Sequence, residues 1–132
     1  MNKAIIMGRL SADPELRKTE SGISSCRFTV AVQEDYKNKD GSRDVDFINC
    51  KAWRSTAEYV SQNFKKGSRI AVIVKNKCEA YEKDGEKHFF YYVKAESVEF
   101  AGYNKPVSGT VDEADRDFPA EFDEIISEDS PL

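Results

Sequence analysis

The sequence predicts an all-β protein: a five-stranded OB barrel with one short helix, followed by an acidic C-terminal tail. Apolar and polar residues alternate in several segments of residues 1–103, which is the period of a β-strand. A helical pattern interrupts these segments once, between the third and fourth predicted strands, and this is the element order of the OB barrel. Over residues 104–132 the periodicity ends and acidic residues, Ser, Pro and Gly dominate, so we expect a disordered tail there.

The first two predicted strands precede a polar loop. Residues 2–10 form the first strand, which ends before Pro14 because proline interrupts strand pairing. Residues 23–34 form the second strand, in which every other residue is apolar. The loop over residues 37–43 contains an Asp-Gly pair, which is a hairpin signal.

The third predicted strand, residues 45–53, has two unlike faces and leads into a helix. One face carries Phe47, Lys51 and Trp53, and the other carries Ile48, Cys50 and Ala52. Ser55-Thr56-Ala57-Glu58 reads as a capping box that starts a short helix. Lys65-Lys66-Gly67 then provides a cationic last turn and a glycine at which the helix ends.

The last two strands are long and joined by a second hairpin tip. The fourth covers about residues 69–81, the tip residues 83–86, and the fifth about residues 88–100. In the fifth strand the apolar parity shifts after Ala95. This shift predicts a bulge or bend, as the closure of a small barrel requires.

The charge of the chain is divided between its two parts. Residues 1–103 carry 18 Lys and Arg against 15 Asp and Glu, whereas residues 104–132 carry 2 against 9. The formal net charge of −4 therefore joins a mildly basic body to a strongly acidic tail. A polyanion is attracted to the first and repelled by the second, which indicates a nucleic-acid binder with a separate docking arm.

Composition and motifs argue against several other classes of protein. The sequence has no glycine-rich phosphate loop and no nucleophile elbow, so we expect no enzyme activity and no cofactor. Cys26, Cys50 and Cys78 with the single His88 do not have the spacing of a metal site, and we expect reduced, mostly buried thiols. We find no signal peptide and no apolar run of membrane-spanning length, so we expect a cytoplasmic, nucleoid-associated protein.

Rings alternate with cations on the predicted strands, as binding of an unpaired nucleic-acid strand requires. The candidate stacking residues are Tyr36, Phe47, Trp53 and Tyr81. The candidate phosphate contacts are Arg9, Lys37, Lys39, Arg43, Lys51, Arg54, Lys75 and Lys77. The alternative is that Phe47 and Trp53 belong to the core. Against it, the opposite face of their strand already supplies an inward surface, and Lys51 is not easily buried beside the rings.

Several motifs follow one another in residues 1–103. They are Asn2-Lys3-Ala4-Ile5-Ile6-Met7-Gly8-Arg9-Leu10, Asp13-Pro14-Glu15-Leu16-Arg17, Phe28-Thr29-Val30-Ala31-Val32, Asp46-Phe47-Ile48-Asn49-Cys50, Ala52-Trp53, Thr56-Ala57-Glu58, Lys65-Lys66-Gly67-Ser68 and Ala95-Glu96-Ser97-Val98-Glu99-Phe100. Each motif is weak alone, but the ordered set resembles the single-stranded DNA-binding proteins of bacteria and their phages. The resemblance covers essentially the whole body.

The resemblance implies an OB-fold subunit of a homotetramer that coats and protects unwound DNA. It places the family's stacking aromatics on the four rings named above. The chain departs from the family at Lys75-Asn76-Lys77, where many relatives have Gly-Arg-Leu, and at Glu79, whose charge is unfavourable beside phosphate. The alternative function is an OB-fold protein-interaction module, or a primosome or RNA-binding module, without a strong role in stacking single-stranded DNA.

The C-terminal tip resembles the family's docking peptide. Relatives commonly end in an acidic run, an apolar residue, Pro and Phe, whereas this chain ends in Glu128-Asp129-Ser130-Pro131-Leu132. The resemblance implies that replication, recombination and repair proteins dock on this tip. The alternative is an acidic tail that only keeps the protein soluble.

Overall fold

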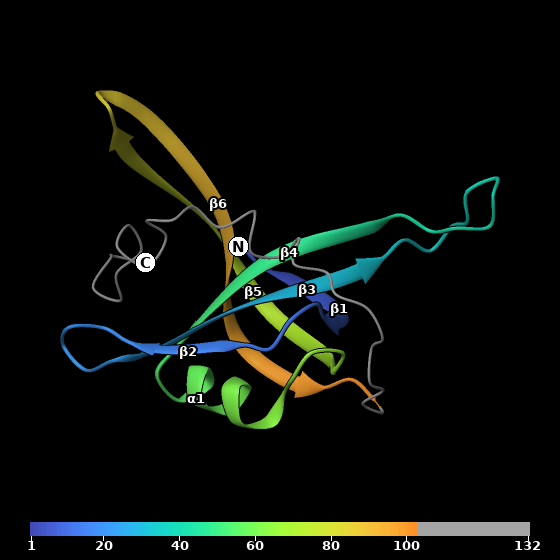
Figure 1. Ribbon diagram of the computed structural model, residues 1–132, viewed down its shortest axis with the longest axis horizontal. Helices are drawn as coiled ribbons and strands as arrows, with labels where there is room; N and C mark the ends of the chain where they lie inside the picture. The colour runs from blue at the N-terminus through green and yellow to red at the C-terminus, as the bar shows by residue number, and fades with distance from the viewer. Residues whose placement is uncertain (103–132) are drawn as a thin grey trace.

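The computed structural model of the protein describes residues 1–102 and shows a small β barrel from which two long hairpins extend (Figure 1). The helix α1 (Arg54–Asn63) lies between β4 and β5. The predicted boundary at residue 103 and the predicted tail lie outside the described residues. The strands are β1 (Ala4–Leu10), β2 (Glu15–Lys18), β3 (Ser24–Gln33), β4 (Val45–Trp53), β5 (Arg69–Lys83) and β6 (Glu86–Phe100).

Five of these strands close into a ring, which confirms the predicted OB barrel. The neighbours run β1–β5–β6–β4–β3, and β3 returns to β1, where Leu10 pairs with Val30. Pairing is antiparallel except between β4 and β6, where Cys50 pairs with Val93 in parallel. The short β2 adds to the sheet beside β3.

Strand alternation fills the barrel, as the sequence predicts. The helix α1 lies across one end of the barrel (Figure 1). Its residues Ala57 and Val60, with Phe64 just after the helix, belong to the same buried cluster as the strand residues. Burial of each large apolar side chain contributes about 1.5–3 kcal/mol. The strand members are Ile6, Leu10, Cys26, Phe28, Val30, Cys50, Ala52, Ile70, Val72, Val74, Val93 and Ala95.

Both ends of the helix differ from the prediction. The helix begins at Arg54 with no side-chain cap hydrogen bond, so the predicted capping box is not formed. Glu58 instead accepts a hydrogen bond of 3.0 Å from the Ser24 hydroxyl on β3, and its carboxylate is therefore turned to the sheet. The backbone is already extended at Phe64. Lys65 therefore follows the helix and does not belong to its last turn.

Two features of the strands bear on the prediction. The strand β2 was not predicted, because its four residues ELRK contain one apolar side chain and show no period. The predicted irregularity of the last strand is confirmed. Ile73 pairs with Ser97 whereas Val74 pairs with Ala95, so Glu96 is the extra residue of a bulge.

The three cysteines are free thiols, with Cys26 and Cys50 buried and Cys78 exposed. Burial raises the pKa of Cys26 to about 12. Within residues 1–102 no His, Cys, Asp and Glu side chains gather in a group able to hold a metal ion. No helix in this part of the chain has the length and apolar character needed to cross a membrane.

Candidate nucleic-acid interface

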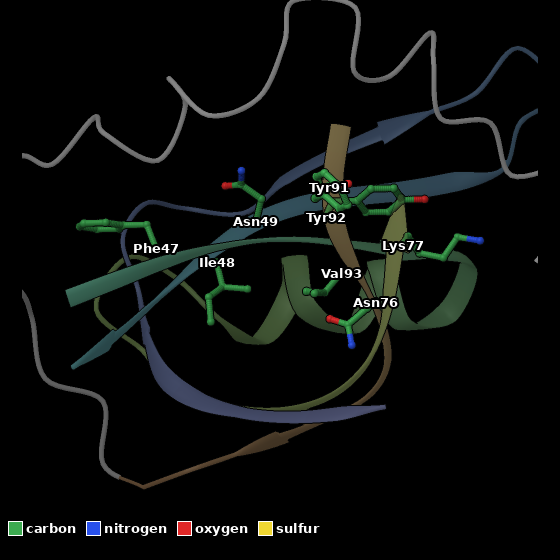
Figure 2. Close-up of a pocket in the computed structure, with 8 residues that line it drawn as sticks. All are labelled: Phe47, Ile48, Asn49, Asn76, Lys77, Tyr91, Tyr92 and Val93. Carbon is green, nitrogen blue, oxygen red and sulfur yellow. The ribbon is translucent and has the colours of Figure 1, made fainter. Parts of the chain in front are cut away.

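The outer face of the barrel carries the alternate residues of β4 that the sequence predicts. Phe47 and Asn49 project from one side of β4 and Ile48 from the other (Figure 2). Asn49 is held on this face by Thr29 of β3, whose hydroxyl donates a 3.2 Å hydrogen bond to the Asn49 Oδ1. The opposite face supplies Cys50 and the other β4 core residues. The two faces of this strand are therefore as predicted.

Four cations lie in a row across the outer face. Arg27 of β3 pairs with Lys51 of β4, Lys51 pairs with Lys94 of β6, and Lys94 pairs with Lys75 of β5. Neighbouring strands are about 4.8 Å apart, so the row extends over roughly 14 Å. Lys51 and Lys75 were predicted as phosphate contacts. Arg27 and Lys94 were missed, because the row runs across strands and appears only when the strand register is known.

Lys51 and Trp53, at the C-terminal end of β4, are packed against each other. Lys51 is only 1% exposed and Trp53 only 9%. The Lys51 Nζ lies 4.9 Å from the centroid of the Trp53 ring, where the quadrupole of the indole attracts a cation. The sequence argument that Lys51 is not easily buried beside the rings is therefore wrong. Trp53 is thus a buried side chain, as the alternative of a core residue holds, although it is not part of the main core cluster.

The arm between β3 and β4 carries one predicted ring and three predicted cations. Tyr36 is 60% exposed, and Lys37 and Lys39 are also exposed. The Arg43 guanidinium donates hydrogen bonds of 3.0 and 2.6 Å to the backbone carbonyls of Glu34 and Asp35. Arg43 therefore fastens the base of the arm, whereas the two lysines extend into solvent.

The hairpin of β5 and β6 carries Tyr81 with further rings that the sequence did not single out. Tyr81 stacks on His88 with ring centroids 5.4 Å apart, and Phe90 lies parallel to Tyr92 at 6.2 Å. Burial, together with the charge and hydrogen bond of Glu79, raises the pKa of Tyr92. The acidic Glu79, a departure from the family pattern, is thus engaged with a tyrosine of the same face.

The remaining predicted contacts lie at the margins of this face. Arg9 and Phe47 both pair with Ala31, on opposite sides of β3, but the Arg9 guanidinium donates to the Gly67 carbonyl at 3.1 Å. Arg54 starts the helix directly after Trp53. Lys77 pairs with Tyr92 on the hairpin. The predicted tip Glu128-Asp129-Ser130-Pro131-Leu132 lies outside the described residues.

A closed OB barrel with cations and rings on its outer face is the architecture of oligonucleotide-binding OB domains. The chain belongs to the single-strand binding protein family, whose family model matches residues 1–101. It is 44% identical over 101 residues to "Single-stranded DNA-binding protein 2" of Listeria monocytogenes, which covers 76% of this chain and 63% of that protein. It is 43% identical over 101 residues to "Single-stranded DNA-binding protein A" of Bacillus subtilis, covering 76% and 59% respectively. The match thus spans about three fifths of these relatives.

Proposed function

We propose that the protein binds single-stranded DNA without sequence preference. The strand would run from the loop between β3 and β4, over the barrel, to the β5–β6 hairpin. The row of Arg27, Lys51, Lys94 and Lys75 carries this proposal, because it provides successive positive charges between two ring-bearing hairpins. Arg27 is ion-paired with Glu15 at 2.9 Å and Lys51 is buried beside Trp53, so both must leave these partners to reach a phosphate. Bases that stack on exposed rings gain about 1–3 kcal/mol each, and the cations neutralise phosphates. The names of the relatives support this ligand.

Binding of this kind coats and protects unwound DNA. A ligand that binds only one state pulls an equilibrium toward that state, so a protein specific for the open strand melts DNA hairpins. Stacking tolerates any sequence because every base has a π-face. We therefore propose a role in DNA replication, recombination and repair, in the cytoplasm and associated with the nucleoid.

The function is tested by titrating the fluorescence of Trp53, the single tryptophan of the chain, with oligo-dT at two salt concentrations. A strand that takes Lys51 from the indole, or stacks on it, changes the emission of Trp53. We expect saturable quenching that weakens with salt, with a slope of about −0.7 per phosphate neutralised. A duplex of the same length is the control and should leave the emission unchanged.

Other outcomes of this titration select other functions. No response to oligo-dT at low salt would contradict the stacking path and favour the protein-interaction module. A stronger response to oligo-U than to oligo-dT would favour an RNA-binding module.

We further propose that the protein is a homotetramer that uses the outer face of β1 and β5. Ile5 pairs with Ile73, and Met7 lies on the same face of β1. These three apolar side chains are exposed, Ile5 at 78%. A contiguous exposed apolar patch is typical of a surface that a partner covers.

We also propose that Glu128-Asp129-Ser130-Pro131-Leu132 recruits replication, recombination and repair proteins. The acidic composition of residues 104–132 supports this, because their net charge of −7 repels DNA and leaves the tail for basic partners. A basic pocket would take the carboxylates and an apolar slot would take Leu132.

A further inference from the structure

A small pocket opens where β4 and the β5–β6 hairpin part from each other (Figure 2). Its volume is ≈ 260 Å³. Ile48 and Val93 give it apolar walls, Phe47 and Tyr91 contribute rings, and Asn76 contributes an amide. Pockets for drug-sized ligands begin at about 300 Å³, so this one suits a single planar ring system.

The amide of Asn76 is fixed in one orientation by Asn2. The Asn2 Nδ2 donates to the Asn76 carbonyl at 2.8 Å, and the Asn76 backbone N–H donates to the Asn2 Oδ1 at 3.2 Å. Because backbone donors and acceptors cannot exchange places, these two bonds determine which end of the Asn2 amide is oxygen. The Asn76 Nδ2 then donates to the same Asn2 Oδ1 at 3.1 Å.

This arrangement leaves the Asn76 Oδ1 as an acceptor at the pocket. It accepts no hydrogen bond from the residues that the structure describes. Figure 2 shows this oxygen on the side of Ile48 and Val93, with the nitrogen turned away from them. The pocket therefore offers apolar walls, rings and one oriented acceptor, the combination with which proteins hold an unstacked base.

We propose that the pocket takes one nucleobase of the bound strand and that the Asn76 Oδ1 accepts a hydrogen bond from an N–H on the Watson–Crick edge of that base. The inference rests on the proposed binding of single-stranded DNA. Every base carries such a group: an imino N–H in thymine and guanine, an amino N–H in cytosine and adenine. The pocket is thus compatible with any sequence. In a duplex the same N–H is already paired, so the contact reports that a base is unpaired.

The pocket differs from the stacking path in what it senses. A ring on the outer face senses the presence of a flat base but not the hydrogen-bonding groups on its edge. The Asn76 oxygen senses one N–H of that edge. N3-methylthymidine keeps the thymine ring and replaces its N3–H by a methyl group, so it separates the two kinds of contact.

The test compares the affinity of the full chain for oligo-dT and for the same oligonucleotide built from N3-methylthymidine. We expect the methylated strand to bind about three- to tenfold more weakly for each occupied pocket, the effect of one neutral hydrogen bond. Asn76→Ala should bind the two strands equally. Asn2→Ala should reduce the difference, because it releases the orientation of the Asn76 amide. Tyr36→Ala is the matched control and should weaken both strands by the same factor.

The outcomes separate this inference from the function on which it rests. Equal binding of the two strands by the unaltered chain would overturn the pocket while leaving DNA binding intact. A difference that persists in both Asn76→Ala and Asn2→Ala would overturn the role of the amide. Failure of the unaltered chain to bind either strand would instead contradict the proposed function.

Discussion

Gly8 shows how little room the closed barrel leaves at the seam between β1 and β3. A Cβ atom at Gly8 would lie 2.3 Å from the carbonyl oxygen of Ala31 and 2.9 Å from a methyl carbon of Val30. The nearest of these atoms belongs to the backbone, so the contact cannot be relieved by rotating a side chain. The ring closes at this seam because residue 8 has no side chain.

Gly8→Ala should therefore lower the free energy of unfolding by about 1–3 kcal/mol, the usual cost of overpacking a well-packed site. Urea unfolding followed by circular dichroism measures the change. Gly85→Asn is the matched control. Gly85 has φ +78, and a Cβ atom there would meet nothing within 4 Å. Asparagine also tolerates this left-handed conformation. Similar losses at the two glycines would contradict the account of the seam.

Single residues also show where the sequence is informative and where it is not. Strand parity predicts that Trp53 and Lys51 share the outer face, and they do. Parity does not report depth: Lys51 is only 1% exposed, with its Nζ 4.9 Å from the centroid of the indole. The orientation of the Asn76 amide could not be predicted either, because it is set by Asn2, which lies 74 residues away in the chain.

Among the elements, the two hairpins show what an Asp-Gly pair predicts about a turn and what it does not. Asp84 and Gly85 both have positive φ and join the paired residues Lys83 and Glu86, which is the tight turn that an Asp-Gly pair predicts. The other Asp-Gly pair, at residues 40–41, lies within a longer loop between Gln33 and Val45. The same dipeptide predicts that the chain reverses at both places. The length of each loop depends on pairing between the flanking strands.

The outer face of β1 and β5 allows the proposed assembly to be tested. Ile5→Glu places a charge in the apolar patch and should raise the dissociation constant of the oligomer at least about tenfold, since burial of one such side chain contributes about 1.5–3 kcal/mol. Sedimentation equilibrium measures this. Leu16→Glu, at a 44% exposed residue of β2, is the control and should leave the assembly intact. A monomeric unaltered chain, or equal assembly of both variants, would refute this interface.

At the scale of the whole molecule, the separation of charge predicts two independent activities. Leu132→Asp keeps the acidic character of the tail but removes its apolar end. If Leu132 enters an apolar slot of the partner as proposed, its loss should weaken partner binding by about one to two orders of magnitude. Retention of replication, recombination and repair proteins from a bacterial extract, compared with the unaltered chain, measures this. Affinity for oligo-dT is the control and should not change. Equal retention by both chains would contradict docking through Leu132 and favour a tail that only keeps the protein soluble.

The whole fold was more predictable than its binding surface. Element order and strand alternation are local properties, and they led to the barrel, the inserted helix and the bulge at Glu96. The cation row and the pocket depend on the register between β4, β5 and β6. Register between strands that are distant in the chain follows from barrel closure, and no period within one strand encodes it.

The parallel pairing of β4 with β6 links the stability of the barrel to the binding of a polyanion. Between β4 and β6 the ladder has two paired positions, and Lys51 and Lys94 occupy one of them. Like charges directly opposite each other push neighbouring strands apart. A phosphate chain lying across Lys94 and across Lys51, once Lys51 has left the indole of Trp53, would act as a counterion shared by the two strands. A bound nucleic acid would then stabilise the barrel itself at one of its two shortest ladders, the other being the one between β1 and β3.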